Sequence, residues 1–156
     1  MPKITLREVT EEDLINNLDI IRNEKLPKLH RERLNKQLEG KSVYFIAFED
    51  KKPVGHIYVN HQGDYQYPLL EDLFVKKTER KRGIAKEILR QVELYAEKQG
   101  YEKLGINSEV GENWVQQFYE NIGFAITSGP HTQSWTEKDT GKIIVMNIYH
   151  LHKKLK

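Results

Sequence analysis

The stretch Leu69-Leu-Glu-Asp-Leu-Phe-Val75 is followed closely by Arg80-Lys-Arg-Gly-Ile-Ala85 and a long apolar-striped segment. This order predicts a buried strand, a tight basic loop and the start of a helix. A helix N-terminus carries a partial positive charge from its aligned peptide dipoles, so acidic residues are usual there. Cations at this position repel the dipole unless an anion binds. The loop therefore predicts a phosphate site, in which backbone N–H groups of the first helical turn bind the anion.

Positive charge is concentrated in this loop. The chain has 156 residues and a formal net charge of +2. Residues 76–86 contain six cations and one anion, a balance of +5, which leaves −3 for the rest of the chain. A nucleic-acid partner would need a broad basic face, so the pattern favours one small anionic ligand and no nucleic acid.

The composition narrows the remaining function classes. The chain contains no cysteine, which excludes disulfides, thiolate nucleophiles and cysteine-based zinc sites. The histidines lack the spacing of a known metal site, so we expect no metal. No stretch approaches the length of a membrane span, and the N-terminus lacks the apolar core of a signal peptide. We therefore expect a cytoplasmic protein without a membrane partner.

Hydrophobic periodicity predicts one domain over residues 1–156, in which strands alternate with helices in a mixed α/β or α+β arrangement. The strongest helix spans residues 83–99 and ends at Gly100, a residue suited to a left-handed cap. Residues 61–67 predict a polar, aromatic loop. The other predicted helices begin at Thr10 or span 26–40 and 113–121, and the predicted strands are 3–9, 43–48, 54–59, 68–75, 101–110, 124–127 and 143–151, with 132–136 as a further candidate.

Two motifs together resemble a known family. The run Arg80–Ala85 after a strand fits the Arg/Gln-x-x-Gly-x-Gly/Ala motif of the GNAT superfamily, the acetyl-CoA-dependent N-acetyltransferases. The run Phe118-Tyr-Glu-Asn-Ile-Gly-Phe124 is similar to the second signature of that superfamily, and the resemblance covers about residues 43–124. It implies the GNAT fold: a mixed, mostly antiparallel sheet with helices on both faces and an opening between the fourth and fifth strands.

The resemblance also implies a reaction, the transfer of an acetyl group from acetyl-CoA to a primary amine by direct attack, without an acyl-enzyme. A loop that enters a helix can donate several N–H groups to the diphosphate of coenzyme A, and Gly83 lets the ligand approach the backbone. Basic side chains add charge-assisted bonds. In the family, backbone groups of the fourth strand hold the acetyl carbonyl and the pantetheine arm. The residues assigned to coenzyme A are Leu73, Phe74, Val75, Arg80, Lys81, Arg82, Gly83, Ile84, Ala85 and Asn113.

Catalytic roles follow from the same resemblance. Tyr119 lies where the family keeps its general acid, and a phenol with a pKa of about 10 can protonate a departing thiolate. Asp72 and Glu71 are candidate bases, Asp72 being preferred, and strand alternation predicts that they lie on opposite faces. A water chain without a dedicated base, or a carboxylate that only attracts a cationic substrate, are the alternatives. Asn113 is predicted to contact the pantetheine arm, to act as the N-cap of its helix, or both.

Other assignments stay open at the level of sequence. The acceptor is expected to be a small-molecule amine rather than a protein N-terminus or a lysine, and homodimers are frequent in the superfamily. The competing functions are a non-catalytic acyl-CoA sensor or scaffold of the same fold, and a nucleic-acid-binding module that uses residues 76–86. Tyr65 and Tyr67 are predicted either to line an acceptor pocket or to clasp the sheet edge. Trp114 is expected to pack in the helix core.

Overall fold

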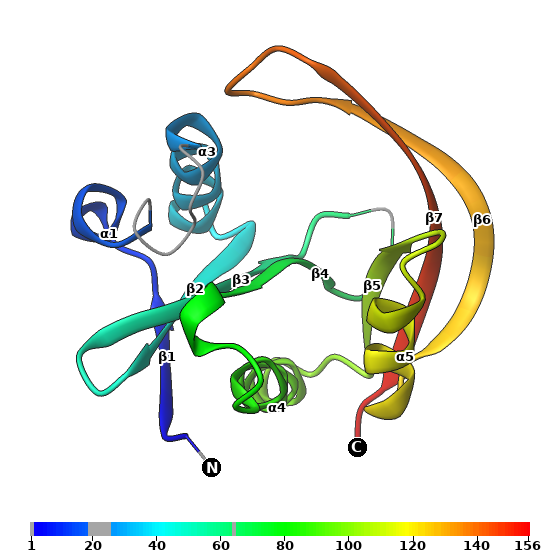
Figure 1. Cartoon of the computed structure of the whole chain (residues 1–156), viewed down its shortest axis with the longest axis horizontal. Coiled ribbons are helices and arrows are strands. Elements are labelled where there is room, and N and C mark those ends of the chain that lie inside the picture. Colours follow the sequence, from blue (N-terminus) through cyan, green and yellow to red (C-terminus); the bar gives the residue numbers. More distant parts are fainter. Residues whose placement is uncertain (1, 19–25, 64) are drawn as a thin grey trace.

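The computed structural model describes residues 2–18, 26–63 and 65–156. Seven strands form one sheet in the order β1-β2-β3-β4-β5-β7-β6 (Figure 1). The strands are β1 (Ile4–Glu8), β2 (Ser42–Glu49), β3 (Lys52–Asn60), β4 (Leu69–Val75), β5 (Lys103–Glu109), β6 (Ala125–Thr136) and β7 (Ile143–Lys154). The helices are α1 (Glu11–Asn16), α3 (Pro27–Leu38), α4 (Ile84–Lys98) and α5 (Asn113–Asn121), with a short 3-10 turn, η1 (Lys77–Glu79).

The sheet opens between β4 and β5. All other neighbouring strands pair antiparallel, whereas β4 and β5 run parallel. Their ladder contains only the pairs Leu69–Gly105 and Leu70–Ile106. Beyond Leu70, β4 keeps its pairing with β3 but has none with β5. The mixed sheet and the opening predicted from the sequence are therefore confirmed.

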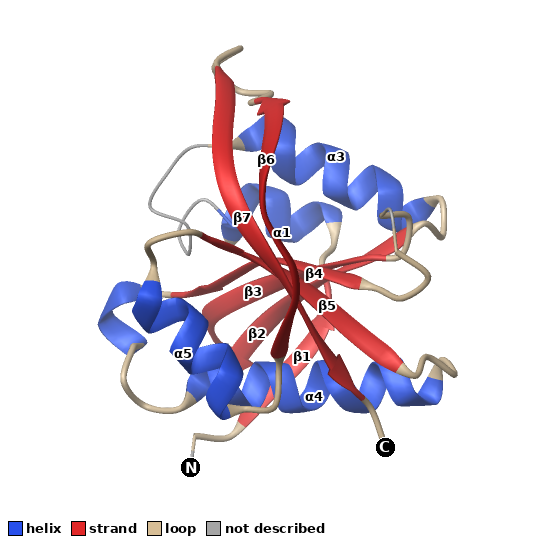
Figure 2. Ribbon diagram, turned by 90° about the vertical axis from the view of Figure 1, so that its right-hand side faces the viewer, coloured by secondary structure: helices blue, strands red, loops and turns tan. Residues whose placement is uncertain are grey.

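Helices cover both faces of the sheet, as expected (Figure 2). The apolar stripe of α4 enters the main core, where Ile88 and Val92 are fully buried. Helix α5 packs into the same core through Tyr119. On the opposite face, α1 and α3 lie over a second cluster of buried residues that includes Tyr44 and Tyr58. At about 25 cal/mol per Å² of apolar surface, these two clusters supply most of the driving force for folding.

The last two strands form a hairpin longer than the sequence predicted. The segments 124–127 and 132–136 join in one strand, β6, with register shifts around residues 126–131. The hairpin arches toward α3 (Figure 1), and at its tip the Asp139 carboxylate accepts hydrogen bonds from the backbone N–H groups of Lys28 and Leu29, at 3.0 and 3.3 Å. Pairing with β7 keeps the polar second half of β6 extended. The turn propensity of these residues alone does not predict this extension.

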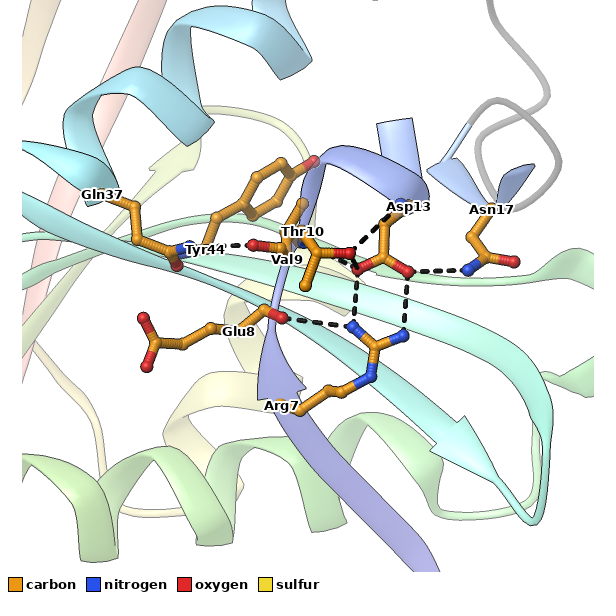
Figure 3. Close-up of polar contacts among 8 residues, drawn as sticks. All are labelled: Arg7, Glu8, Val9, Thr10, Asp13, Asn17, Gln37 and Tyr44. Atoms are coloured by element: carbon orange, nitrogen blue, oxygen red, sulfur yellow. Dashed lines mark hydrogen bonds and ion pairs between the residues drawn. The ribbon is translucent and has the colours of Figure 1, made fainter. Parts of the chain in front are cut away.

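The start of α1 is built as the sequence predicted. Thr10 and Asp13 form a capping box, and Asp13 also accepts two hydrogen bonds from Arg7, at 2.6 and 2.9 Å, and one from Asn17 (Figure 3). Burial opposes ionisation of Asp13, but these bonds outweigh it and lower its pKa to about 2. Leu14, Ile15, Leu18 and Ile21 follow Thr10 at helical spacing in the sequence, which predicts an apolar stripe. Ile15 is nevertheless 80% exposed, and Ile21 lies outside the described residues.

We expect Asp13→Asn to remove part of the acid sensitivity of the protein. The folded-state pKa lies below the ordinary 3.8, so the ionised carboxylate stabilises the fold fully above about pH 4 and loses this effect as pH falls toward 2. The wild type should lose ~2 kcal/mol more than the variant over this window. Urea denaturation at pH 6, 4 and 2 measures the difference, with the exposed neighbour Glu12→Gln as control. Parallel pH curves for Asp13→Asn and the wild type would contradict the assignment.

Candidate active site

The loop that leads into α4 presents unpaired backbone donors. Gly83 adopts the left-handed conformation, with φ of 81°, directly before the first helical residue, and no side chain caps the helix. Within the described part of the chain, the N–H groups of residues 81–86 have no hydrogen-bond acceptor. Such a row of donors at a positive helix end binds phosphate oxygens well.

The cations of the loop divide into two groups. The guanidinium of Arg82 is held by Glu49, at 2.6 and 2.9 Å, and by Glu79, at 3.0 Å, so only its backbone N–H is available to an anion. Arg80 donates its Nε to the Val75 carbonyl oxygen at 2.8 Å, which leaves its two terminal nitrogens. Lys81 is exposed and makes no ion pair with the described residues. Arg80 and Lys81 are therefore the side chains suited to phosphate.

Strand β4 contains a bulge that the sequence did not reveal. The register with β3 shifts between His56 and Tyr58, and Asp72 takes a positive φ of 54°. A bulge inserts one extra residue and so reverses the alternation of side chains beyond it. Glu71 and Asp72 consequently both face α3, where each lies near Arg33. The prediction that they lie on opposite faces is wrong for this reason.

The two carboxylates have different surroundings. Asp72 forms a 2.6 Å ion pair with Arg33, and the side chains of the pair are only 17% and 10% exposed. Burial raises the pKa of Glu71 above its ordinary value, against the opposing effects of its hydrogen bond with Asn60 and the charge of Arg33. A base needs a carboxylate that is not already neutralised and has a raised pKa. These properties favour Glu71 over Asp72.

We expect Asp72→Asn to destabilise the protein by ~3 kcal/mol, because Arg33 would keep a buried charge without its partner. Asparagine tolerates positive φ, so the substitution tests the charge rather than the backbone. The matched control is Asp50→Asn, at an exposed turn position with a similar φ of 56°. Chemical denaturation measures both. Equal, small losses for the two variants would show that the ion pair adds little.

The backbone of β4 faces the opening at alternate residues. The N–H of Lys76 bonds to the Val54 carbonyl oxygen at 2.8 Å, so groups of Lys76 and, by alternation, Phe74 point toward β3. Those of Val75 point away from β3, toward the opening, and those of Leu73 follow the same alternation. Of the three strand residues assigned to the cofactor, Leu73 and Val75 thus have backbone groups on the β5 side.

Helix α5 brings Tyr119 into the core between Phe118 and Phe124. Tyr119 is 6% exposed, and burial raises its pKa above the ordinary value. The Tyr119 hydroxyl makes no hydrogen bond within the described residues, yet it is not fully shielded from solvent.

Two other predictions for helix α5 are wrong. Asn113 is the first residue of the helix and the N-cap is Glu112, so Asn113 does not have the predicted capping role. Trp114 is 74% exposed, against the prediction that it packs in the core.

Arg33 was not singled out from the sequence, whereas Tyr65 and Tyr67 were. Arg33 lies on the same helical face as Leu26 and Leu29. A charged residue within an apolar stripe is unusual, and this pattern could have identified Arg33 from the sequence. The loop tyrosines act as a clasp: Tyr65 stacks on His150 with ring centroids 3.9 Å apart, and the Tyr67 hydroxyl lies 2.7 Å from His150 Nε2. Burial lowers the pKa of His150 to about 4, so it stays neutral near pH 7.

Neither a metal centre nor a membrane helix emerges from the residues that the structure describes. Their His, Asp and Glu side chains form no group of three that could hold a metal ion. No helix among them combines the length and apolarity that crossing a bilayer requires.

Comparison with known proteins gives a consistent family. A family model described as an acetyltransferase (GNAT) domain matches residues 6–137. The comparison with curated protein sequences gives no match. A GNAT family acetyltransferase from Elizabethkingia anophelis, solved with acetyl-CoA bound, superposes with a TM-score of 0.66 at 20% identity, covering 97% of this chain and 98% of that one.

Two further solved structures resemble the chain over almost its full length. The ribosomal-protein-S18-alanine N-acetyltransferase from Escherichia coli gives a TM-score of 0.74 at 12% identity, covering 99% of this chain and 95% of that one. The spermidine N-acetyltransferase from Vibrio cholerae, in complex with CoA and spermine, gives 0.73 at 15% identity, covering 97% and 95%. At such identities the similarity shows the fold alone, while the family match extends over most of the sequence. The chain belongs to the GNAT acetyltransferase family.

Proposed function

We propose that the protein transfers the acetyl group of acetyl-CoA to a primary amine of a small molecule. The observation that carries this proposal is the row of N–H groups at residues 81–86, which have no acceptor among the described residues and lie beside the opening between β4 and β5. A diphosphate bound there would direct its pantetheine arm toward that opening. The structures from Elizabethkingia anophelis and Vibrio cholerae, which hold acetyl-CoA and CoA, support the same ligand class.

In this proposal, each part of acetyl-CoA is bound by specific residues. The backbone N–H groups of residues 81–86 bind the diphosphate, together with the side chains of Arg80 and Lys81. Backbone groups of Leu73 and the backbone N–H of Val75 position the thioester, because the Val75 carbonyl oxygen already accepts a hydrogen bond from Arg80. Asn113 contacts the pantetheine arm.

The chemical step is a direct displacement. The amine nitrogen attacks the acetyl carbonyl carbon, so a C–N bond forms and the C–S bond breaks. Glu71 accepts the proton that the amine loses, and Tyr119 gives its proton to the departing sulfur. Asp72 acts as a support that holds Arg33 rather than as the base. Cytoplasmic location and a homodimer stay predictions.

Calorimetric titration with acetyl-CoA, followed by a screen of amines for CoA release, tests the proposal. A thiol reagent detects released CoA without background from the protein, because the chain has no cysteine. Saturable binding together with release that depends on the amine is the expected result. Silence in the titration would overturn the proposal, and binding without release by any amine would leave a sensor of the same fold as the better description.

A further inference from the structure

A polar cavity of about 300 Å³ lies between α3, the end of β3 and β4. It is at the small end of the range for small-molecule sites. Glu71 lies on its sheet side, and Tyr58 and Asn60 of β3 complete that side. The backbone of Leu73, two residues beyond Glu71, faces the opening into which the thioester would extend. The cavity is therefore placed to hold an acceptor next to the proposed base.

Some charged side chains around this cavity are neutralised by ion pairs, and others are not. Arg33 is neutralised by Asp72 at 2.6 Å, and Glu32 is paired with Lys138 at 2.9 Å. Lys36 of α3 forms no ion pair with any described residue. Lys41, which follows α3, has one ion-pair contact within the described residues, at 3.6 Å to the exposed Glu39.

Among the described residues that line the cavity, one carboxylate and two ammonium groups therefore remain for a ligand. The carboxylate of Glu71 comes from the sheet, whereas the ammonium groups of Lys36 and Lys41 come from the helix side. A ligand that carries both charges would satisfy both sides. A polyamine would meet Glu71 favourably but would be repelled by the two lysines.

We propose that this cavity binds an acceptor with a carboxylate beside its primary amine, that is, a free α-amino acid or a close analogue. The ammonium group lies at Glu71 and the carboxylate at Lys36 and Lys41. This inference rests on the proposed function and specifies its substrate class. Glu71 first accepts one proton from the bound ammonium group and passes it to water, which leaves a neutral amine. The amine nitrogen then forms the C–N bond and gives its second proton to Glu71, while the C–S bond breaks and Tyr119 protonates the thiolate, so acetylation yields an N-acetylamino acid and CoA. Solvent returns the proton from Glu71 to Tyr119.

The test compares ligands that differ only in the carboxylate. Free L-amino acids, the matching amino-acid amides and spermidine are assayed for CoA release, and the best acid and its amide are titrated into the enzyme–CoA complex. We expect the acid to show a KM about tenfold or more below that of its amide, since a charge-assisted bond has this strength. Lys36→Met should raise KM for the acid about tenfold and leave that of the amide nearly unchanged.

One control and one further variant separate the outcomes. Lys28→Met changes an exposed lysine of the same helix outside the cavity and should behave as wild type; Lys41→Met provides a second test if Lys36→Met folds poorly. Release of CoA with amides or spermidine as good as with acids, unaffected by either substitution, would overturn this inference while the acetyltransferase proposal stands. Binding of an amino acid that depends on Lys36, but without CoA release, would support the site and overturn the transfer reaction.

Discussion

We expect Tyr119→Phe to lower kcat by roughly 10²–10⁴-fold, the usual contribution of a general acid, with the affinity for acetyl-CoA unchanged. Phenylalanine keeps the ring between Phe118 and Phe124, so the core should lose little stability. Only the hydroxyl disappears, and that group makes no hydrogen bond within the described residues. Steady-state kinetics with the best amine, together with calorimetry for the cofactor, measures the two effects separately.

The pH dependence of the rate and a control substitution at Trp114 also test this role of Tyr119. Burial raises the pKa of Tyr119, so the hydroxyl keeps its proton throughout the neutral range and the rate should show no loss from this group up to about pH 9. Trp114→Phe changes an aromatic residue on the same helix that is 74% exposed, and it should leave kcat unchanged. A Tyr119→Phe enzyme with wild-type kcat would show that the tyrosine only packs.

Gly83→Ala should weaken binding of acetyl-CoA by about tenfold to a hundredfold, which corresponds to the loss of one charge-assisted hydrogen bond. Gly83 has a φ of 81°, at which an L-residue is strained. In the proposed binding mode, an added Cβ would also hinder the approach of the diphosphate to the backbone of this loop. The variant tests the backbone donors without changing any charge. Calorimetric titration gives the affinity directly.

Gly100→Ala is the matched control for backbone strain. Gly100 follows the C-terminal end of the same helix, with a φ of 88°. Apart from its chain neighbours, no heavy atom of the described residues lies within 4 Å of the place that an alanine Cβ would occupy. Both variants should lose ~1 kcal/mol of folding stability, because alanine is disfavoured in the left-handed region. Only Gly83→Ala should lose affinity. If the two variants bind acetyl-CoA equally well, the diphosphate does not rest on this turn.

Local features of the chain were predictable because a few neighbouring residues encode them. Helix α5 spans residues 113–121 as the sequence indicated, and α1 begins with the Thr10–Asp13 capping box. Left-handed Gly83 and Gly100 border α4 at both ends. Side-chain periodicity, capping bonds and glycine dihedrals all act within one or two turns of helix. The two signature motifs share this local character, so the fold class was also predictable from the sequence.

The charge state of the candidate site could not be predicted from the sequence, because it depends on ion-pair partners that are distant in the chain. Arg82 meets Glu49 from β2, 33 residues away, and its guanidinium is therefore not a free cation. Asp72 meets Arg33, 39 residues away, and the bulge at Asp72 places its side chain on the same face as that of Glu71. Charges attract according to their separation in space, and strand register depends on the whole sheet. Which carboxylate can accept a proton, and which cations face the ligand, is therefore a property of the folded molecule.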